Sequence, residues 1–137
     1  EIFNKWNIDE NTFWNKCKEK MNNGYDMEHS YIKTLIDYAN SDKKYNLSNK
    51  DLFELGKNIT LYDGLSKKNN QITIFDDINK ITQKDEYKEH NIEVEYFIIS
   101  GGLEEMINGA LVGNKIDKYF KKVFACKLDE KDGVINF

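Results

Sequence analysis

The chain has 137 residues, of which 39% are hydrophobic and 32% are charged, and its net charge is -4. This balance is typical of a folded globular protein and excludes a disordered chain. The negative charge and the lack of a basic cluster argue against nucleic-acid binding. The length suffices for one domain, or for a small domain plus part of another.

No apolar run approaches the length of a transmembrane helix and no signal peptide is recognisable, so we predict a cytoplasmic protein without membrane contact. Cys17 and Cys126 lie far apart and lack C-x-x-C spacing, which favours two reduced thiols over a disulfide. The sequence starts at Glu1 without Met and stops at Phe137 in or just after a predicted hairpin. We therefore expect it to be part of a longer protein.

The first half of the chain predicts three short amphipathic helices. Asp9 or Thr12 can cap the first helix and Asp26 the second. Ser48-Asn-Lys-Asp51 resembles a capping box, with Asp in place of Glu or Gln, for a third helix that Gly56 ends. We expect these helices to pack as a small antiparallel bundle.

The composition changes between Lys57 and Asn70, where turn residues dominate. We therefore place a domain boundary near residue 60, with a helical domain over 1–60 and an α/β domain over 61–137. The second domain is predicted to contain a helix over 74–90, a strand over 94–100, an amphipathic helix from Leu103 to Leu111, a short helix over 116–122, a strand over 123–128 and a hairpin turn at Asp132-Gly133. The two longer strands should be parallel because a helix connects them.

The central feature is the stretch from Val94 to Gly102. Phe97, Ile98 and Ile99 follow one another without a polar break, as expected of a strand covered on both faces. Ser100 should end this strand, and Gly101-Gly102 should turn it directly into the next helix. Such a turn directs one hydroxyl and several unpaired backbone N–H groups at one point, where an anion is the natural ligand.

The apolar strand, Ser-Gly-Gly, the amphipathic helix and Phe120-Lys-Lys-Val-Phe-Ala125 occur here in an order that resembles the haloacid dehalogenase-like (HAD) hydrolases, in particular their phosphoserine-phosphatase-like branch. The resemblance extends through the hairpin to Phe137 and back to Leu55. Asp63-Gly64 stands where relatives commonly have Pro-Gly.

This resemblance implies an α/β fold class, with a small helical-bundle cap followed by an incomplete Rossmann-like core. It implies that Ser100 and Gly101 bind the phosphoryl group of a small phosphorylated metabolite, which the parent protein hydrolyses through an aspartyl-phosphate with Mg²⁺. The Asp-x-Asp motif that such enzymes need is absent, and counterparts of their lysine and metal-binding acids are expected beyond Phe137. We therefore expect no catalytic residue and no metal ligand in this fragment, and no activity from it alone.

Ser100 has two further interpretations. As a nucleophile it lacks the Gly-x-Ser-x-Gly elbow, since position 98 is Ile, and both His29 and His90 precede it. It could also simply cap the following helix. For the whole chain, the alternative to a phosphohydrolase fragment is a non-catalytic module that binds another protein.

Four other patterns are less specific. Asp76-Asp77 resembles a magnesium-binding acid pair, but it precedes Ser100 and falls on a predicted helix, which favours a solvated helix face. The stretch from Gly109 to Lys115 resembles a Walker loop whose glycine spacing is short by one residue. His29 and His90 lack partners at metal-ligand spacing and are predicted to be surface residues. Four aromatic residues could line a substrate pocket, although a role in the core is favoured: Trp14, Tyr25, Tyr31 and Tyr38.

Overall fold

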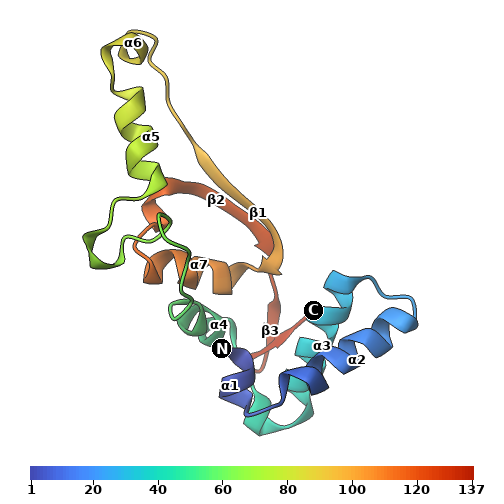
Figure 1. Cartoon of the computed structure of the whole chain (residues 1–137). Coiled ribbons are helices and arrows are strands. Elements are labelled where there is room, and N and C mark those ends of the chain that lie inside the picture. Colours follow the sequence, from blue (N-terminus) through green and yellow to red (C-terminus); the bar gives the residue numbers. More distant parts are fainter.

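The computed structural model describes residues 1–137, which form a mixed α/β structure. The α-helices are α1 (Ile2–Trp6), α2 (Glu10–Asn22), α3 (Met27–Ser41), α4 (Asn49–Gly56), α5 (Ile74–Thr82), α6 (Asp85–Lys88) and α7 (Glu104–Gly113). The strands are β1 (Tyr96–Leu103), β2 (Phe120–Cys126), β3 (Asp129–Lys131) and β4 (Val134–Asn136) (Figure 1). None of the helices combines the length and the apolar character needed to cross a bilayer.

The predicted caps start the helices of the first half. The Asp9 carboxylate accepts a hydrogen bond from the Thr12 N–H at 2.8 Å, and Asp26 accepts one from the His29 N–H at 2.8 Å. At α4, Ser48 and Asp51 form the predicted reciprocal capping box. The starts of α2, α3 and α4 are therefore confirmed.

The predicted three-helix bundle is only partly correct. Helices α2 and α3 pack together, but α4 turns away and packs on α7. The α4–α7 crossing has no room for side chains: a Cβ on Gly109 would lie 2.0 Å from the Phe53 carbonyl oxygen, and one on Gly56 would lie 2.2 Å from the Met106 carbonyl oxygen. Gly113 is equally constrained. The glycines that resembled a Walker loop thus serve helix packing.

The parallel pairing of β1 with β2 through α7 is confirmed. The connection between α7 and β2 differs from the prediction. The short helix over 116–122 is wrong, because only Asp117–Tyr119 forms a 3₁₀ turn and Phe120 already pairs with Tyr96. Lys115, with a φ of 59°, breaks the helical path after α7.

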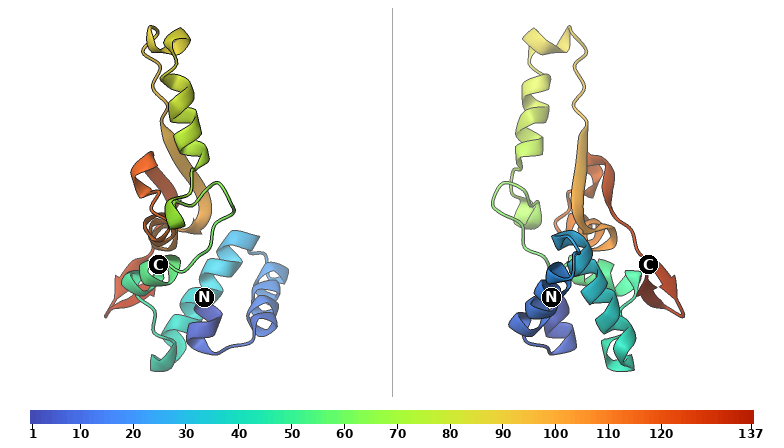
Figure 2. Two further views of the ribbon diagram at one scale, coloured as in Figure 1. Left: turned by 60° about the vertical axis from the view of Figure 1, so that its left-hand side comes forward. Right: turned by 90° about the vertical axis from the view of Figure 1, so that its right-hand side faces the viewer.

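The predicted helix over 74–90 is divided into α5 and α6. Lys84 has an extended ψ of 148°, which separates them. Together α5 and α6 form an arm that projects from the rest of the molecule, and the chain returns along this arm into β1 (Figures 1 and 2).

The expectation that β1 is covered on both faces is wrong in this structure. Ile98 is half-buried towards α7, whereas Ile99 is 86% exposed. Phe97 and Phe124 stack on each other at 6.4 Å and remain 47% and 46% exposed. The sheet consists of β1 and β2 alone, so one of its faces presents apolar side chains to solvent.

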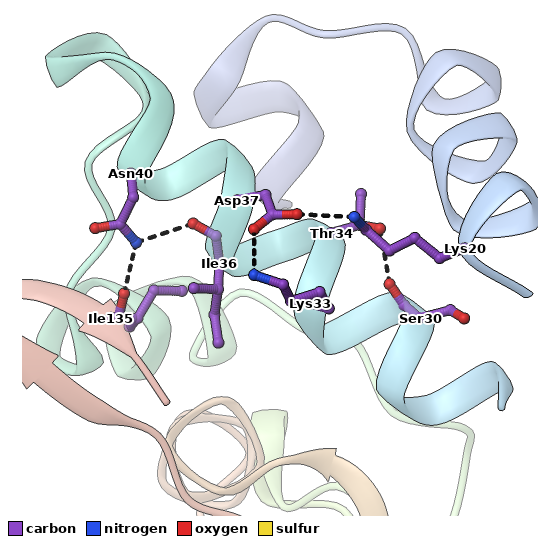
Figure 3. A network of polar contacts seen from close by, with 8 residues as sticks. All are labelled: Lys20, Ser30, Lys33, Thr34, Ile36, Asp37, Asn40 and Ile135. Carbon is purple, nitrogen blue, oxygen red and sulfur yellow. Dashed lines mark hydrogen bonds and ion pairs between the residues drawn. The ribbon is translucent and has the colours of Figure 1, made fainter. Parts of the chain in front are cut away.

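The hairpin β3–β4 turns at Asp132-Gly133 as predicted, with positive φ at both residues. It packs on the helical half rather than on the larger sheet. The Ile135 N–H donates to the Leu47 carbonyl at 2.8 Å, and the Asn40 amide donates to the Ile135 carbonyl at 2.9 Å (Figure 3). Leu103 and Leu128 share the main hydrophobic core with α1, α2 and α3. Because side chains from both halves share this core, the division at residue 60 stays a prediction.

A polar contact also connects α3 to α2. The Asp37 carboxylate accepts hydrogen bonds from Lys20 of α2 at 2.8 Å and from Lys33 at 2.7 Å (Figure 3). These groups are partly exposed, so the apolar contacts beneath them dominate the stability of the pair.

The α4–α7 crossing generates a stability prediction. Gly109→Ala should lower the free energy of unfolding by about 1–3 kcal/mol or more, because the new methyl group meets backbone that cannot rotate away. Asn108→Ala on the neighbouring position of α7 is the matched control and should be tolerated. Urea unfolding of both variants measures the difference, and equal stabilities would contradict the close crossing.

Candidate functional site

The Ser-Gly-Gly stretch forms a bulge in β1. Ile99 pairs with Phe124 and Leu103 pairs with Cys126, so β1 uses two more residues than β2 between these pairs. Ser100, Gly101 and Gly102 therefore depart from the regular ladder. Ser100 and Gly101 are exposed, and the Ser100 Oγ accepts a hydrogen bond from the Gly102 N–H at 3.0 Å.

The predicted direct turn from Ser100 into a helix is wrong. Strand β1 continues to Leu103, and α7 begins only at Glu104. Leu103 is buried in the main core and paired with β2, so its placement delays the start of the helix. The residue that precedes α7 is Leu103, which has no capping side chain, and Ser100 is thus not the cap of this helix. Any anion at Ser100 would use the N–H groups of the bulge rather than the first turn of α7.

The two histidines give Ser100 no general base. His29 Nδ1 lies 2.7 Å from the Asp26 carboxylate, and His90 Nε2 lies 3.9 Å from Glu89. Neither forms a hydrogen bond with the Ser100 hydroxyl. The geometry therefore gives no support to a serine nucleophile, which needs a base within hydrogen-bond reach.

The helical half of the chain reaches the bulge through the first turn of α3. A Cβ built on Gly101 would lie 3.3 Å from the Cγ of Glu28. The Asp26 cap fixes where α3 begins and thereby fixes the position of Glu28. Sequence reasoning missed this residue, because an acid in the first turn of a helix is expected for the helix dipole alone.

An apolar cavity of about 450 Å³ lies on the α7 side of β1. Ile98, Gly102 and Phe120 line it from the β-α-β unit, and Tyr31 lines it from α3. Burial raises the pKa of the Tyr31 hydroxyl. Tyr31 is the one member of the predicted aromatic group in this wall; Tyr38 is buried in the core, while Trp14 and Tyr25 are substantially exposed.

Asp76 and Asp77 do not form a metal-binding pair. Asp76 accepts hydrogen bonds from Lys67 at 2.7 Å and from the Tyr119 hydroxyl at 2.6 Å, and it completes a capping box with Thr73. Asp77 points to Lys80 at 3.4 Å. Asp76 is thus a structural link rather than part of a merely solvated face.

These contacts also decide how well Mg²⁺ fits this chain. The Lys67 ammonium, followed by the Tyr119 hydroxyl and the Thr73 N–H, holds the pKa of Asp76 far below its usual range. A carboxylate already paired with a lysine is a poor ligand for a cation. No group of three or more His, Cys, Asp or Glu residues lies close enough to hold a metal ion. The acid pair of Asp76 and Asp77 therefore does not fit Mg²⁺.

Comparisons with known proteins give a relative but no family. No family model matches the chain, and no solved structure matches it. An uncharacterized protein of Borreliella burgdorferi is 29% identical over 133 residues. The match includes 92% of this chain and 42% of that protein, so the chain spans less than half the length of this relative.

The Asp76 link predicts a pH-dependent contribution to stability. The native pKa is depressed, so the contribution is present above the unfolded pKa of about 3.9 and is lost as the pH falls further towards the native value. Asp76→Asn should therefore be less stable than the wild type at neutral pH, and the gap should close below about pH 4.

Urea unfolding at several pH values measures this gap. Asp77→Asn is the matched control, because the Asp77 carboxylate is exposed and forms a surface ion pair with Lys80. A gap for Asp76→Asn that stays constant across the acid range would show that its charge is not responsible.

Proposed function

We propose that the chain is part of a HAD-like phosphohydrolase, in which the Ser100 hydroxyl and the Gly101 N–H bind the phosphoryl group of a small phosphorylated metabolite. The observation that carries this proposal is the exposed Ser-Gly-Gly bulge near the carboxyl end of β1, in a parallel β-α-β unit. Ligands of open α/β sheets bind outside the carboxyl ends of their strands. The resemblance of the strand, Ser-Gly-Gly and helix to the HAD pattern supports the same assignment.

The chemistry of this site would be positioning and charge stabilisation. Phosphoryl transfer depends mainly on holding the phosphoryl oxygens and on matching their charge. The Ser100 hydroxyl and a backbone N–H can each donate a hydrogen bond to a charged oxygen, and the absence of a side chain at Gly101 leaves the backbone accessible.

We assign the remaining chemistry to other parts of a longer protein. The chain contains no Asp-x-Asp, and its Asp76-Asp77 pair is engaged by Lys67 and Lys80, so we assign the nucleophile and the metal ligands to polypeptide outside this chain. Two observations support a longer protein: the exposed face around Ile99 and the greater length of the Borreliella burgdorferi relative. Additional polypeptide over this face would complete a Rossmann-like core, with the helical half as its cap.

The second candidate is a non-catalytic interaction module. The exposed side chains of Phe97, Ile99 and Phe124 favour it, because contiguous apolar surface often marks a binding face. This function would need that face but not the Ser100 hydroxyl. A substitution that removes the Ser100 hydroxyl therefore distinguishes the two candidate functions.

We predict that Ser100→Ala in the longer protein lowers kcat/KM by about 10- to 100-fold, because a hydrogen bond to a charged group contributes roughly 1.5–3 kcal/mol. The free energy of unfolding should hardly change, since Ser100 does not cap α7. Ser100→Thr keeps the hydroxyl and is the matched control. Full activity of Ser100→Ala would remove the phosphate-binding role.

The chain of 137 residues alone should not hydrolyse phosphate esters, because the nucleophile is assigned elsewhere. A chromogenic phosphate ester with Mg²⁺ provides the assay. Turnover that a substitution within this chain abolishes would show that the chemistry has been misplaced.

A further inference from the structure

Glu28 brings a negative charge from the helical half to the Ser-Gly-Gly bulge. Its side chain is exposed, and its Cγ lies 3.3 Å from the position of a Cβ on Gly101. It forms no ion pair in the structure, whereas the neighbouring Asp26 is engaged by His29. The carboxylate of Glu28 is therefore not neutralised by a basic side chain.

The distance between Glu28 and a bound anion is limited by this contact. The carboxylate is one bond beyond Cγ, and the Gly101 N–H belongs to the residue that Cγ approaches. An anion held by this N–H would lie within about 10 Å of the carboxylate, which is the Debye length at 0.1 M salt. Mobile ions therefore screen the repulsion only in part.

We propose that Glu28 is a specificity-determining residue that sets the charge of the ligand accepted at Ser100, by opposing doubly charged phosphoryl groups more than singly charged ones. This inference rests on the proposed phosphate-binding role of the bulge. The repulsion grows in proportion to the charge of the ligand, whereas hydrogen bonds from Ser100 and Gly101 reach a tetrahedral head group of either charge. Glu28 thus shifts the preference of the site towards singly charged phosphoryl groups.

A purely structural role for Glu28 predicts a different behaviour. In that case the carboxylate only complements the dipole of α3. Its removal then slightly lowers the free energy of unfolding and leaves ligand binding unchanged. The two roles differ in whether the effect depends on ligand charge.

The test uses two anions of the same shape, methylphosphonate at a pH where it is doubly charged and methanesulfonate, which is singly charged. Titration of the ¹⁵N-labelled chain, followed at the Gly101 and Gly102 amide resonances, gives the Kd of each. Glu28→Gln should tighten methanesulfonate binding by about two- to fourfold and methylphosphonate binding by about four- to sixteenfold. The amide spectrum of the variant also reports that it remains folded.

Two further variants separate the possible outcomes. Glu86→Gln makes the same change in net charge on α6, at the far end of the projecting arm, and should leave both Kd values unchanged (Figure 1). Ser100→Ala should weaken both ligands if the bulge is the anion site. Unchanged binding in Ser100→Ala, or no binding by any variant, would overturn the site and the proposed function together.

The inference about Glu28 can also fail by itself. If Ser100→Ala weakens binding but Glu28→Gln changes neither Kd, the phosphate-binding role stands and Glu28 has no part in it. Equal tightening of both anions by Glu28→Gln would show an effect that does not depend on the charge of the ligand, such as a hydrogen bond from the new amide, and would likewise overturn the proposal.

Discussion

The arrangement of this molecule depends on the backbone contact between α4 and α7. Gly56 and Gly109 allow the two helices to approach so closely that a single methyl group would collide with a carbonyl oxygen. Through this contact the helical half packs directly on the β-α-β unit, and the close approach of the two backbones fixes the angle between α4 and α7. Because α7 follows β1 immediately, fixing α7 also fixes the end of β1 and therefore the Ser-Gly-Gly bulge.

The hairpin supplies the second connection between the halves. Its Ile135 backbone bonds to Leu47 and Asn40, and its apolar side chains enter the core of the helical half. The start of α3 is consequently held beside the bulge, which explains how Glu28 can lie against Gly101. A charge on one half is thus positioned by contacts that are far from it in sequence.

Features determined by neighbouring residues could be predicted from the sequence. The caps at Asp9, Asp26 and Ser48 and the turn at Asp132-Gly133 follow from local hydrogen bonds and local backbone preferences. The parallel pairing of β1 and β2 followed from the intervening helix.

Features determined by distant contacts could not be predicted in this way. The departure of α4 from the bundle depends on glycines 53 positions apart, Gly56 and Gly109, which meet only in the folded chain. The continuation of β1 beyond Ser100 depends on the pairing of Leu103 with Cys126. For the candidate site, the pattern located the exposed Ser100 and Gly101, whereas the nearby carboxylate of Glu28 comes from a different element. No local signal distinguishes that carboxylate from an ordinary acid in a first helical turn.

The exposed face of the sheet and the missing acids of the candidate site have one common explanation in the proposed function. Two paired strands are marginal as an independent sheet, and Ile99 remains 86% exposed on the uncovered side. A phosphoryl site needs its donors held to within about 0.5 Å, which requires rigid supporting elements around the strand end. Polypeptide that covered Ile99 and paired with the free edge of β1 would supply this rigidity. If this added polypeptide formed a strand beside Ser100, that strand could also carry the nucleophile that attacks the phosphoryl group. The polypeptide that completes the sheet would then also complete the catalytic site.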